Sequence, residues 1–194
     1  MTELPFGGDI YIEKEILKLK EKYEIDTLIE TGSYHGDTTL WFAKNFNKTI
    51  TIEINEEKFN LTNKRLKDNK LKAIAYLGSS EKILNEILPT KGIGHDTIFY
   101  LDAHWYEYNP LIDELKTIAK YNLRPIIVIH DMKEPTNTLQ YDSYNNQDYC
   151  YEWVKPQLDL IYAKHGYNYY YNHPERSIGD RVGVLYVVPN IPKF

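Results

Sequence analysis

The 194-residue sequence has a single cysteine, Cys150, and no apolar run that approaches the length of a membrane-spanning helix. One cysteine excludes an intrachain disulfide and a metal cluster built on several thiolates. Residues 1–12 also lack the basic start and the apolar stretch of a signal peptide. We therefore expect a cytoplasmic protein that has no membrane partner.

Glycine and proline are sparse, with 10 and 9 residues, and the 23 Lys and Arg are outnumbered by 28 Asp and Glu. With 42% hydrophobic residues, the composition is neither fibrous nor disordered. The net charge of -5 argues against a broad phosphate-binding surface, so a nucleic-acid partner is not expected. The length fits one structural domain, with residues 1–24 as an N-terminal segment and helix and residues 25–194 as its main body.

The chain does contain alternating amphipathic helical stretches and short runs of β-branched or aromatic residues. This alternation is typical of a parallel sheet covered by helices. An opening helix carries Ile12, Ile16, Leu19 and Tyr23 on one face. Further helices are expected after Gly36, Asn55, Ser80 and Pro110, and within residues 153–163.

Seven strands are expected, and the last two have the character of a closing antiparallel pair. We therefore predict an α/β fold with a Rossmann-like seven-stranded sheet, mostly parallel, with helices on both faces. Residues 133–149 show no clear period and are interpreted as a long loop. The expected strands are residues 27–30, 49–53, 73–76, 97–101, 125–129, 167–171 and 182–188.

The segment from Ile29 to Thr38 is the most informative, because an apolar strand ends there in a glycine turn and a helix begins. Gly32 lets the backbone turn where a side chain would block a ligand, and Gly36 lets the helix start approach that ligand. The glycine-x-glycine-x-x-glycine spacing of a dinucleotide fingerprint is absent. The turn therefore predicts a small-molecule cofactor other than a nicotinamide dinucleotide.

The Glu-x-Gly-x-x-x-Gly-x-Thr arrangement from Glu30 to Thr38 resembles the first motif of class I S-adenosylmethionine (SAM)-dependent methyltransferases, and the resemblance extends to about Val188. It implies that residues 25–194 form a SAM-binding domain. Glu30 is then placed to attract the ammonium of the methionine moiety, directly or through water.

Two later strand ends fit the same cofactor. Glu53 ends the second expected strand, where its two carboxylate oxygens suit the ribose hydroxyls, although it also suits a helix cap. The turn Gly78-Ser79-Ser80 follows the third strand, where family members often contact the adenine and where a serine also caps a helix. The expected cofactor-binding residues are Glu30, Gly32, Ser33, Tyr34, Gly36, Asp37, Thr38, Glu53, Gly78, Ser79, Ser80 and Asp102.

The catalytic edge is expected after the fourth and fifth strands, where Asp102, His104, His130 and Asp131 follow apolar runs. Ligands of open α/β sheets bind outside the carboxyl ends of the strands, so these four side chains should converge near the reacting methyl group. The local patterns resemble small-molecule O-methyltransferases, among them catechol, macrolide-sugar and cephalosporin-tailoring relatives.

That resemblance implies Mg²⁺ held by Asp102 and Asp131, with His104 or Glu134 completing the site. Met132 stands where catechol-type enzymes have an amide, and a thioether is a poor ligand for a hard ion. The alternative is a metal-free site in which His104 or His130 is the general base, since an imidazole titrates near neutral pH.

The resulting hypothesis is an O-methyltransferase that acts on a hydroxyl of a small molecule or saccharide. The 18 tyrosines favour a flat or glycosidic acceptor where they line a pocket, although tyrosine in strands is equally typical of sheet packing. Residues 5–9 are either a lid over the cofactor or a disordered leader. The alternatives to O-methylation are N-methylation of a macromolecule and a non-catalytic SAM-binding protein. The oligomeric state is open.

Overall fold

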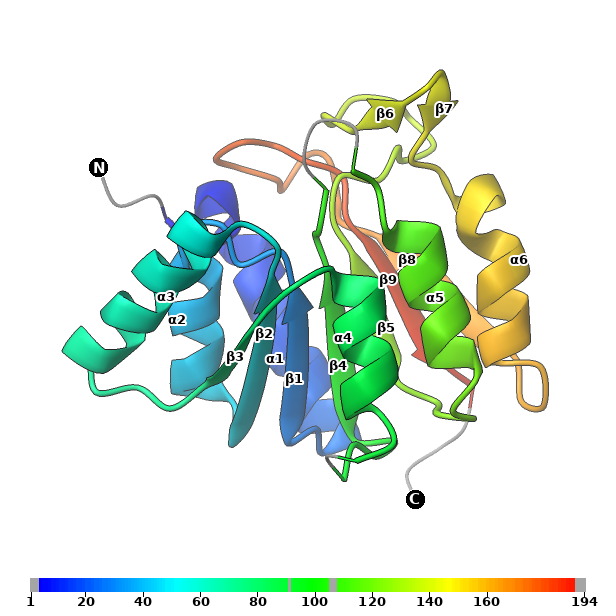
Figure 1. The fold of residues 1–194 in the computed structure, drawn as a ribbon. Coiled ribbons are helices and arrows are strands. Elements are labelled where there is room, and N and C mark those ends of the chain that lie inside the picture. The colour runs from blue at the N-terminus through cyan, green and yellow to red at the C-terminus, as the bar shows by residue number, and fades with distance from the viewer. Residues whose placement is uncertain (1–3, 91, 105–107, 191–194) are drawn as a thin grey trace.

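The computed structural model describes residues 4–90, 92–104 and 108–190, which form a central sheet between two layers of helices (Figure 1). The sheet has seven strands in the order β3-β2-β1-β4-β5-β9-β8. All neighbouring pairs are parallel except β5 with β9 and β9 with β8, which are antiparallel. The strands are β1 (Thr27–Thr31), β2 (Lys48–Glu53), β3 (Ile74–Leu77), β4 (Thr97–Leu101), β5 (Ile126–Ile129), β8 (Tyr167–Tyr171) and β9 (Leu185–Pro189).

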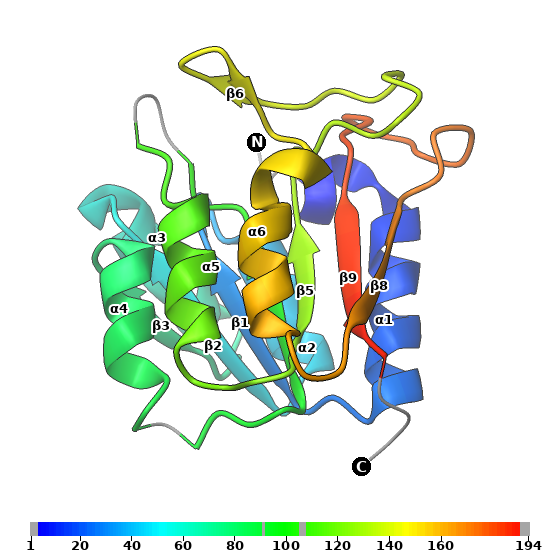
Figure 2. The same cartoon turned by 90° about the vertical axis from the view of Figure 1, so that its right-hand side faces the viewer.

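Helices cover both faces of this sheet (Figure 2). One apolar cluster joins one face of the sheet to helices α4, α5 and α6, and a second joins the other face to α1 and α2. The helix α3 packs beside α2. The helices are α1 (Ile10–Tyr23), α2 (Asp37–Asn45), α3 (Glu56–Asp68), α4 (Ser80–Ile87), α5 (Leu111–Ala119) and α6 (Tyr151–Ile161), preceded by a 3₁₀ turn, η1 (Pro5–Gly8).

The predicted fold class is confirmed, because the sheet is mostly parallel and closes with an antiparallel pair. The central strands β1, β4 and β5 are buried along their whole length, as is usual for parallel strands that helices cover on both faces. The opening helix buries Ile12, Ile16 and Leu19, as predicted from their spacing. No helix in the described part of the chain is both long and apolar enough to cross a membrane.

The predicted strand at residues 182–188 begins later than expected, at Leu185. The reason is that the backbone of Gly183 bonds to the loop after β5: its N–H donates to Gln140 O, and its carbonyl accepts from Met132 N. A Cβ on Gly183 would lie 1.9 Å from Met132 O, so only glycine permits this approach.

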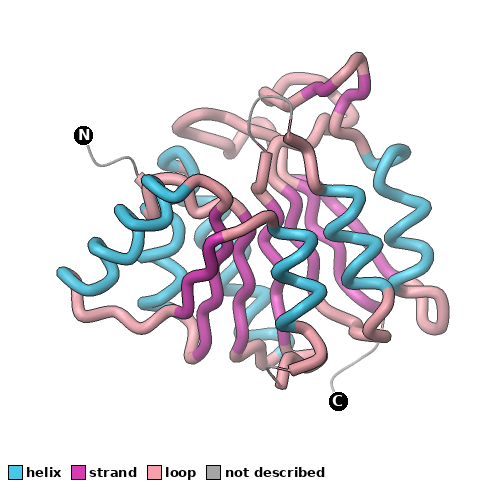
Figure 3. Tube along the Cα trace, in the orientation of Figure 1, coloured by secondary structure: helices cyan, strands magenta, loops and turns pink. Residues whose placement is uncertain are grey.

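The predicted long loop at residues 133–149 contains a short hairpin of β6 (Ser143–Tyr144) and β7 (Gln147–Asp148), seen as isolated strand segments in Figure 3. Asn145 and Asn146 form its tip, both with positive φ, of 50° and 61°. Two residues of positive φ are the signature of a two-residue type I′ hairpin turn, in which asparagine is favoured. The prediction of a continuous loop was wrong at this point.

Candidate functional site

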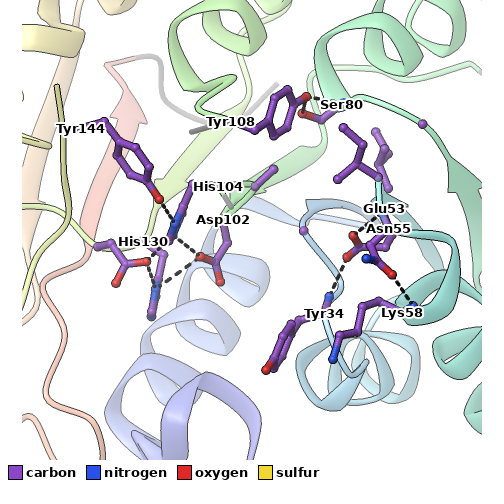
Figure 4. Close-up of a pocket in the computed structure, with 16 residues that line it drawn as sticks. Tyr34, Glu53, Asn55, Lys58, Ser80, Asp102, His104, Tyr108, His130 and Tyr144 are labelled. Atoms are coloured by element: carbon purple, nitrogen blue, oxygen red, sulfur yellow. Dashed lines mark hydrogen bonds and ion pairs between the residues drawn. The ribbon is translucent and has the colours of Figure 1, made fainter. Parts of the chain in front are cut away.

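A cavity of about 550 Å³ lies at the carboxyl edge of the sheet, where β1, β2, β4 and β5 end. Figure 4 shows polar side chains on its two sides, with an acid and histidine cluster facing the end of β2. Its volume falls in the usual range of small-molecule sites. The lining residues are Gly32, Tyr34, Ile52, Glu53, Ile54, Asn55, Lys58, Gly78, Ser80, Asp102, Ala103, His104, Tyr108, His130, Asp131 and Tyr144.

The glycine turn brings β1 against the end of β4. Gly32 has a φ of +82°, and a Cβ there would lie 2.3 Å from Asp102 O. Gly36 also has a φ of +82° and forms the N-cap of α2, where a Cβ would lie 2.8 Å from Thr62 Oγ1. Gly32 lines the cavity, whereas Gly36 supports it through the packing of α2 on α3.

Glu53 is the acid at the cavity wall on the β2 side. Its Oε2 accepts from Tyr34 N at 2.9 Å and from Ser33 Oγ at 3.4 Å, and its Oε1 accepts from Asn55 N at 2.8 Å. These contacts fix the carboxylate between the glycine turn and the start of α3. Oε1 has a further lone pair, and the contact of Ser33 Oγ to Oε2 is long, so the carboxylate can still accept a hydrogen bond from a diol in the cavity.

Glu30 points away from the cavity, although the resemblance places it toward an ammonium. Its Oε2 accepts from Thr39 Oγ1 at 2.5 Å and from Thr51 Oγ1 at 2.7 Å, and the residue is buried. Burial raises its pKa to about 8, against the hydrogen bonds from the two threonines, which lower it. The side chain therefore joins β1 to α2 and β2 and does not line the cavity.

The serine turn after β3 supplies Gly78 and Ser80 to the cavity, whereas Ser79 is the N-cap of α4 and makes no side-chain cap hydrogen bond. Ser80 N donates to the hydroxyl of Tyr108 at 3.2 Å, and that hydroxyl donates to Glu81 Oε2 at 2.6 Å. Tyr108 thus closes this end of the cavity. The neighbouring Trp105 and Tyr106 lie outside the described residues.

The four predicted catalytic residues do converge. Nε2 of His104 lies 2.7 Å from Asp131 Oδ2 and 3.4 Å from Asp102 Oδ1. Nδ1 of His130 lies 3.1 Å from the same Asp131 oxygen and 3.5 Å from the same Asp102 oxygen. The opposite nitrogen of His130, Nε2, is buried and has no hydrogen-bond partner among the described residues.

These contacts decide the protonation of the cluster. Burial lowers the pKa of both histidines, but the carboxylates of Asp102 and Asp131 more than offset this effect and raise it. Burial likewise raises the pKa of Asp131, yet the two imidazoles hold it well below its usual range. In this geometry the histidines carry protons near neutral pH and are hydrogen-bond donors to the carboxylates.

Two members of the cluster were missed as catalytic-edge residues. His104 Nδ1 lies 3.0 Å from Asp142 Oδ2 and 2.9 Å from the hydroxyl of Tyr144. Both residues come from the hairpin segment, about 40 positions further along the chain. Tyr144 was among the tyrosines considered for a substrate pocket, but nothing in the local sequence distinguishes Asp142 from other loop acids.

The donor set fits a divalent cation. One ligand atom each from Asp102, His130 and Asp131 lies within 4.8 Å of the others, and the same holds for His104, Asp131 and Asp142. Mixed carboxylate and imidazole ligands suit Zn²⁺ or Mn²⁺ better than Mg²⁺, which prefers oxygen ligands.

Two other residues that were named for this site from the sequence are not part of either ligand group. Met132 is fully buried beside the cluster. Glu134, one candidate for completing a metal site, instead accepts backbone N–H groups of Thr136, Thr138 and Leu139 and is not part of either ligand group.

A smaller cavity of about 290 Å³ adjoins the first and shares Gly32, Tyr34, Asp102 and His130 with it. The remaining predicted residues of the glycine turn, Ser33, Asp37 and Thr38, line this second space. Of all residues predicted to bind the cofactor, only Glu30, Gly36 and Ser79 line neither cavity.

No protein-family model and no curated protein matches this sequence. Solved structures match its fold. An O-methyltransferase from Bacillus cereus in complex with S-adenosylhomocysteine has a TM-score of 0.65 and 16% identity, over 92% of this chain and 80% of that one. The O-methyltransferase TomG from Streptomyces achromogenes, involved in tomaymycin synthesis and in complex with SAM, has a TM-score of 0.63 and 15% identity, over 92% of this chain and 79% of that one. The [4+2]-cyclase SpnF has a TM-score of 0.59 and 9% identity, over 93% of this chain and 81% of that one.

The chain therefore has the class I SAM-dependent methyltransferase fold, and the predicted resemblance is confirmed at that level. A cyclase has a similar fold, and one fold hosts many reactions, so the reaction has to be argued from the site.

Proposed function

We propose that the protein is a SAM-dependent O-methyltransferase that acts on a hydroxyl of a small molecule or saccharide. The observation that carries the proposal is the pair of opposed walls in one cavity. Glu53 offers acceptors for a ribose diol on one side, and the cluster of Asp102, Asp131 and His104 lies on the other. SAM bound with its ribose at Glu53 would direct its sulfonium toward the acidic cluster.

The methyl group of SAM is already activated, so the protein chiefly has to align the acceptor and to take its proton. Asp102 suits the second task. Its contacts to the two histidines are the longest in the cluster, at 3.4 and 3.5 Å, and its carboxylate borders both cavities. The protonated His104 and His130 stabilise the ionised form of Asp131 and hold the carboxylate of Asp102 in place.

A divalent cation held by Asp102, Asp131 and His130 would bind the acceptor hydroxyl and lower its pKa. His104 would then keep its hydrogen bonds to Asp142 and Tyr144 and hold the hairpin over the cluster.

The acceptor class is suggested by the tyrosines that line the cavity, Tyr144 and Tyr108. The Tyr144 ring lies 5.9 Å from the His104 ring and packs on the buried ring of Tyr149 at 5.6 Å. Tyrosine rings in such a cavity favour flat rings or the apolar face of a sugar. The net charge of -5 disfavours a nucleic acid.

Calorimetric titration of SAM tests the cofactor, with Mg²⁺ or Mn²⁺ present or absent. Glu53→Ala is expected to weaken binding at least tenfold, whereas Glu57→Ala, at an exposed position on α3, is the matched control and leaves it unchanged. Absence of SAM binding to the native protein would refute the proposal.

Methyl transfer to a panel of hydroxylated aromatic and glycosidic acceptors then tests the reaction. Asp102→Asn is expected to lower turnover by about 100-fold or more, the usual contribution of a general base or acid. Full activity of that variant would remove Asp102 from the chemistry, and SAM binding without transfer to any acceptor would favour a non-catalytic binding protein.

A further inference from the structure

The segment before α1 is fixed against the glycine turn. Phe6 is buried, and its ring packs edge-on against Trp41, Phe42 and Tyr100 at centroid distances of 5.1 to 5.6 Å. Its backbone N–H donates to Thr38 Oγ1 at 3.3 Å. The core therefore holds Phe6 in place beside the glycine turn.

The same segment is joined to the loop between β8 and β9, which reaches the N-terminal 3₁₀ turn across the top of the sheet (Figures 1 and 2). Asp180 N donates to Gly7 O at 3.1 Å, and Ser177 Oγ donates to the buried carboxylate of Asp9 at 2.6 Å. A Cβ on Gly179 would lie 2.1 Å from Gly7 O, so glycine is required where the two backbones touch. Two segments about 170 residues apart thus form one wall.

This wall closes the smaller cavity, which Leu4, Phe6, Gly7 and Asp180 line together with the glycine turn. Three acids border that cavity. Asp37 is paired with Arg65 at 2.6 Å, and Asp102 lies beside the two histidines. The carboxylate of Asp180 has no hydrogen bond or ion pair with any described residue, although it lies against Cα of Gly7.

We propose that Asp180 binds the α-ammonium of the methionine part of SAM, which extends from the main cavity into the smaller one. The inference rests on the proposed function. With the adenosine at Glu53 and the sulfonium near Asp102, the methionine tail continues into the space that shares Gly32 and Asp102 with the main cavity. Glu30 is turned into the interior, so Asp180 is the acid available there for a charge-assisted hydrogen bond.

Three ligands distinguish the contribution of the ammonium to binding from that of the rest of the cofactor. S-Adenosylhomocysteine has the complete tail, its deaminated analogue with a 4-thiobutanoate tail has the carboxylate alone, and 5′-methylthioadenosine has neither group. Each is titrated by calorimetry into the native protein, Asp180→Asn, Gly7→Ala and Asp113→Asn. Asp113 is an exposed aspartate on α5 paired with Lys116, and it serves as the matched control.

Asp180→Asn is expected to weaken the binding of S-adenosylhomocysteine about tenfold and to leave the affinities for the other two ligands unchanged. Gly7→Ala is expected to have the same selectivity, because its Cβ would lie 2.3 Å from Asp180 Oδ2 and displace that carboxylate. Unchanged S-adenosylhomocysteine affinity in Asp180→Asn, or an equal loss for all three ligands, would overturn the inference. A native protein that binds none of them would refute the proposed function itself.

Discussion

Nε2 of His104 lies 2.7 Å from Oδ2 of Asp131, although the two residues follow different strands. The same oxygen lies 3.1 Å from Nδ1 of His130. One carboxylate therefore contacts two buried imidazoles, and an anion so placed stabilises both in their protonated form.

Replacement of Asp131 by asparagine tests this relationship. The amide keeps the size of the side chain but removes its charge, so the pKa of His104 and of His130 is expected to fall. NMR titration of the histidine rings measures both values, with Asp113→Asn as the control. Histidine titrations that are the same in Asp131→Asn as in the native protein would show that the carboxylate does not govern them.

Gly32 is predicted to be essential to the turn. In Gly32→Ala the new Cβ would lie 2.3 Å from Asp102 O, which is backbone and cannot move aside. Gly92 also has a positive φ, of 57°, but a Cβ there meets nothing within 4 Å. Gly92→Ala therefore measures only the free-energy cost of placing alanine at a positive φ, without a steric clash.

We expect Gly32→Ala to lose SAM affinity and to be less stable than Gly92→Ala by about 1–3 kcal/mol, the usual cost of overpacking. Thermal unfolding and calorimetry measure the two effects. Equal stabilities and equal affinities would contradict the close approach of the turn to β4.

Glu30→Gln is expected to change how stability depends on pH. The pKa of Glu30 is about 8 in the folded protein and 4.5 for a free side chain, so between these values the folded state holds a proton that the unfolded state has released. Its ionisation therefore makes the native protein less stable as pH rises through that window.

Glutamine does not titrate, so the stability of Glu30→Gln relative to the native protein should increase from pH 4.5 to 8 and then level off. The change amounts to several kcal/mol, since one pKa unit corresponds to about 1.4 kcal/mol. Denaturant unfolding across this range measures it, and the exposed Glu57→Gln is the control. A pH-independent difference would place the carboxyl of Glu30 in water.

Glu134 is predicted to hold the loop after β5. Its carboxylate accepts N–H groups of Thr136, Thr138 and Leu139. Burial raises its pKa, but these hydrogen bonds outweigh that effect and lower it to about 2. The stabilisation is therefore fully present above pH 4.5 and is lost as pH falls toward 2.

Glu134→Ala is expected to cost about 1–3 kcal/mol, because it leaves these amides without their acceptor. Hydrogen exchange of the three amides should accelerate, whereas the exposed Glu86→Ala leaves them protected. Unchanged protection in Glu134→Ala would mean that the loop is held by other contacts.

The order of helices and strands could be predicted from the sequence because periodicity and turn residues are local. The faces of α1, the buried strands β4 and β5 and the glycine turn at Gly32 all follow from patterns within about ten residues. The convergence of Asp102, His104, His130 and Asp131 followed from one further rule, that parallel strands end at the same edge of a sheet.

Side-chain direction was less predictable. Glu30 has the sequence position of a cofactor-binding acid, but Thr39 and Thr51 bond its carboxyl inside the protein. These partners come from α2 and β2, so their placement depends on how three elements pack.

The sequence by itself determined the α/β order, the glycine turn and the acids and histidines at the strand ends, because each depends on short-range pattern or on a general rule of sheets. Only the tertiary structure decided that Asp142 and Tyr144 contact His104 and that Asp180 lies against Gly7. These contacts join residues about 40 and 170 positions apart. Such pairs are set by the packing of the whole chain, which no local pattern specifies.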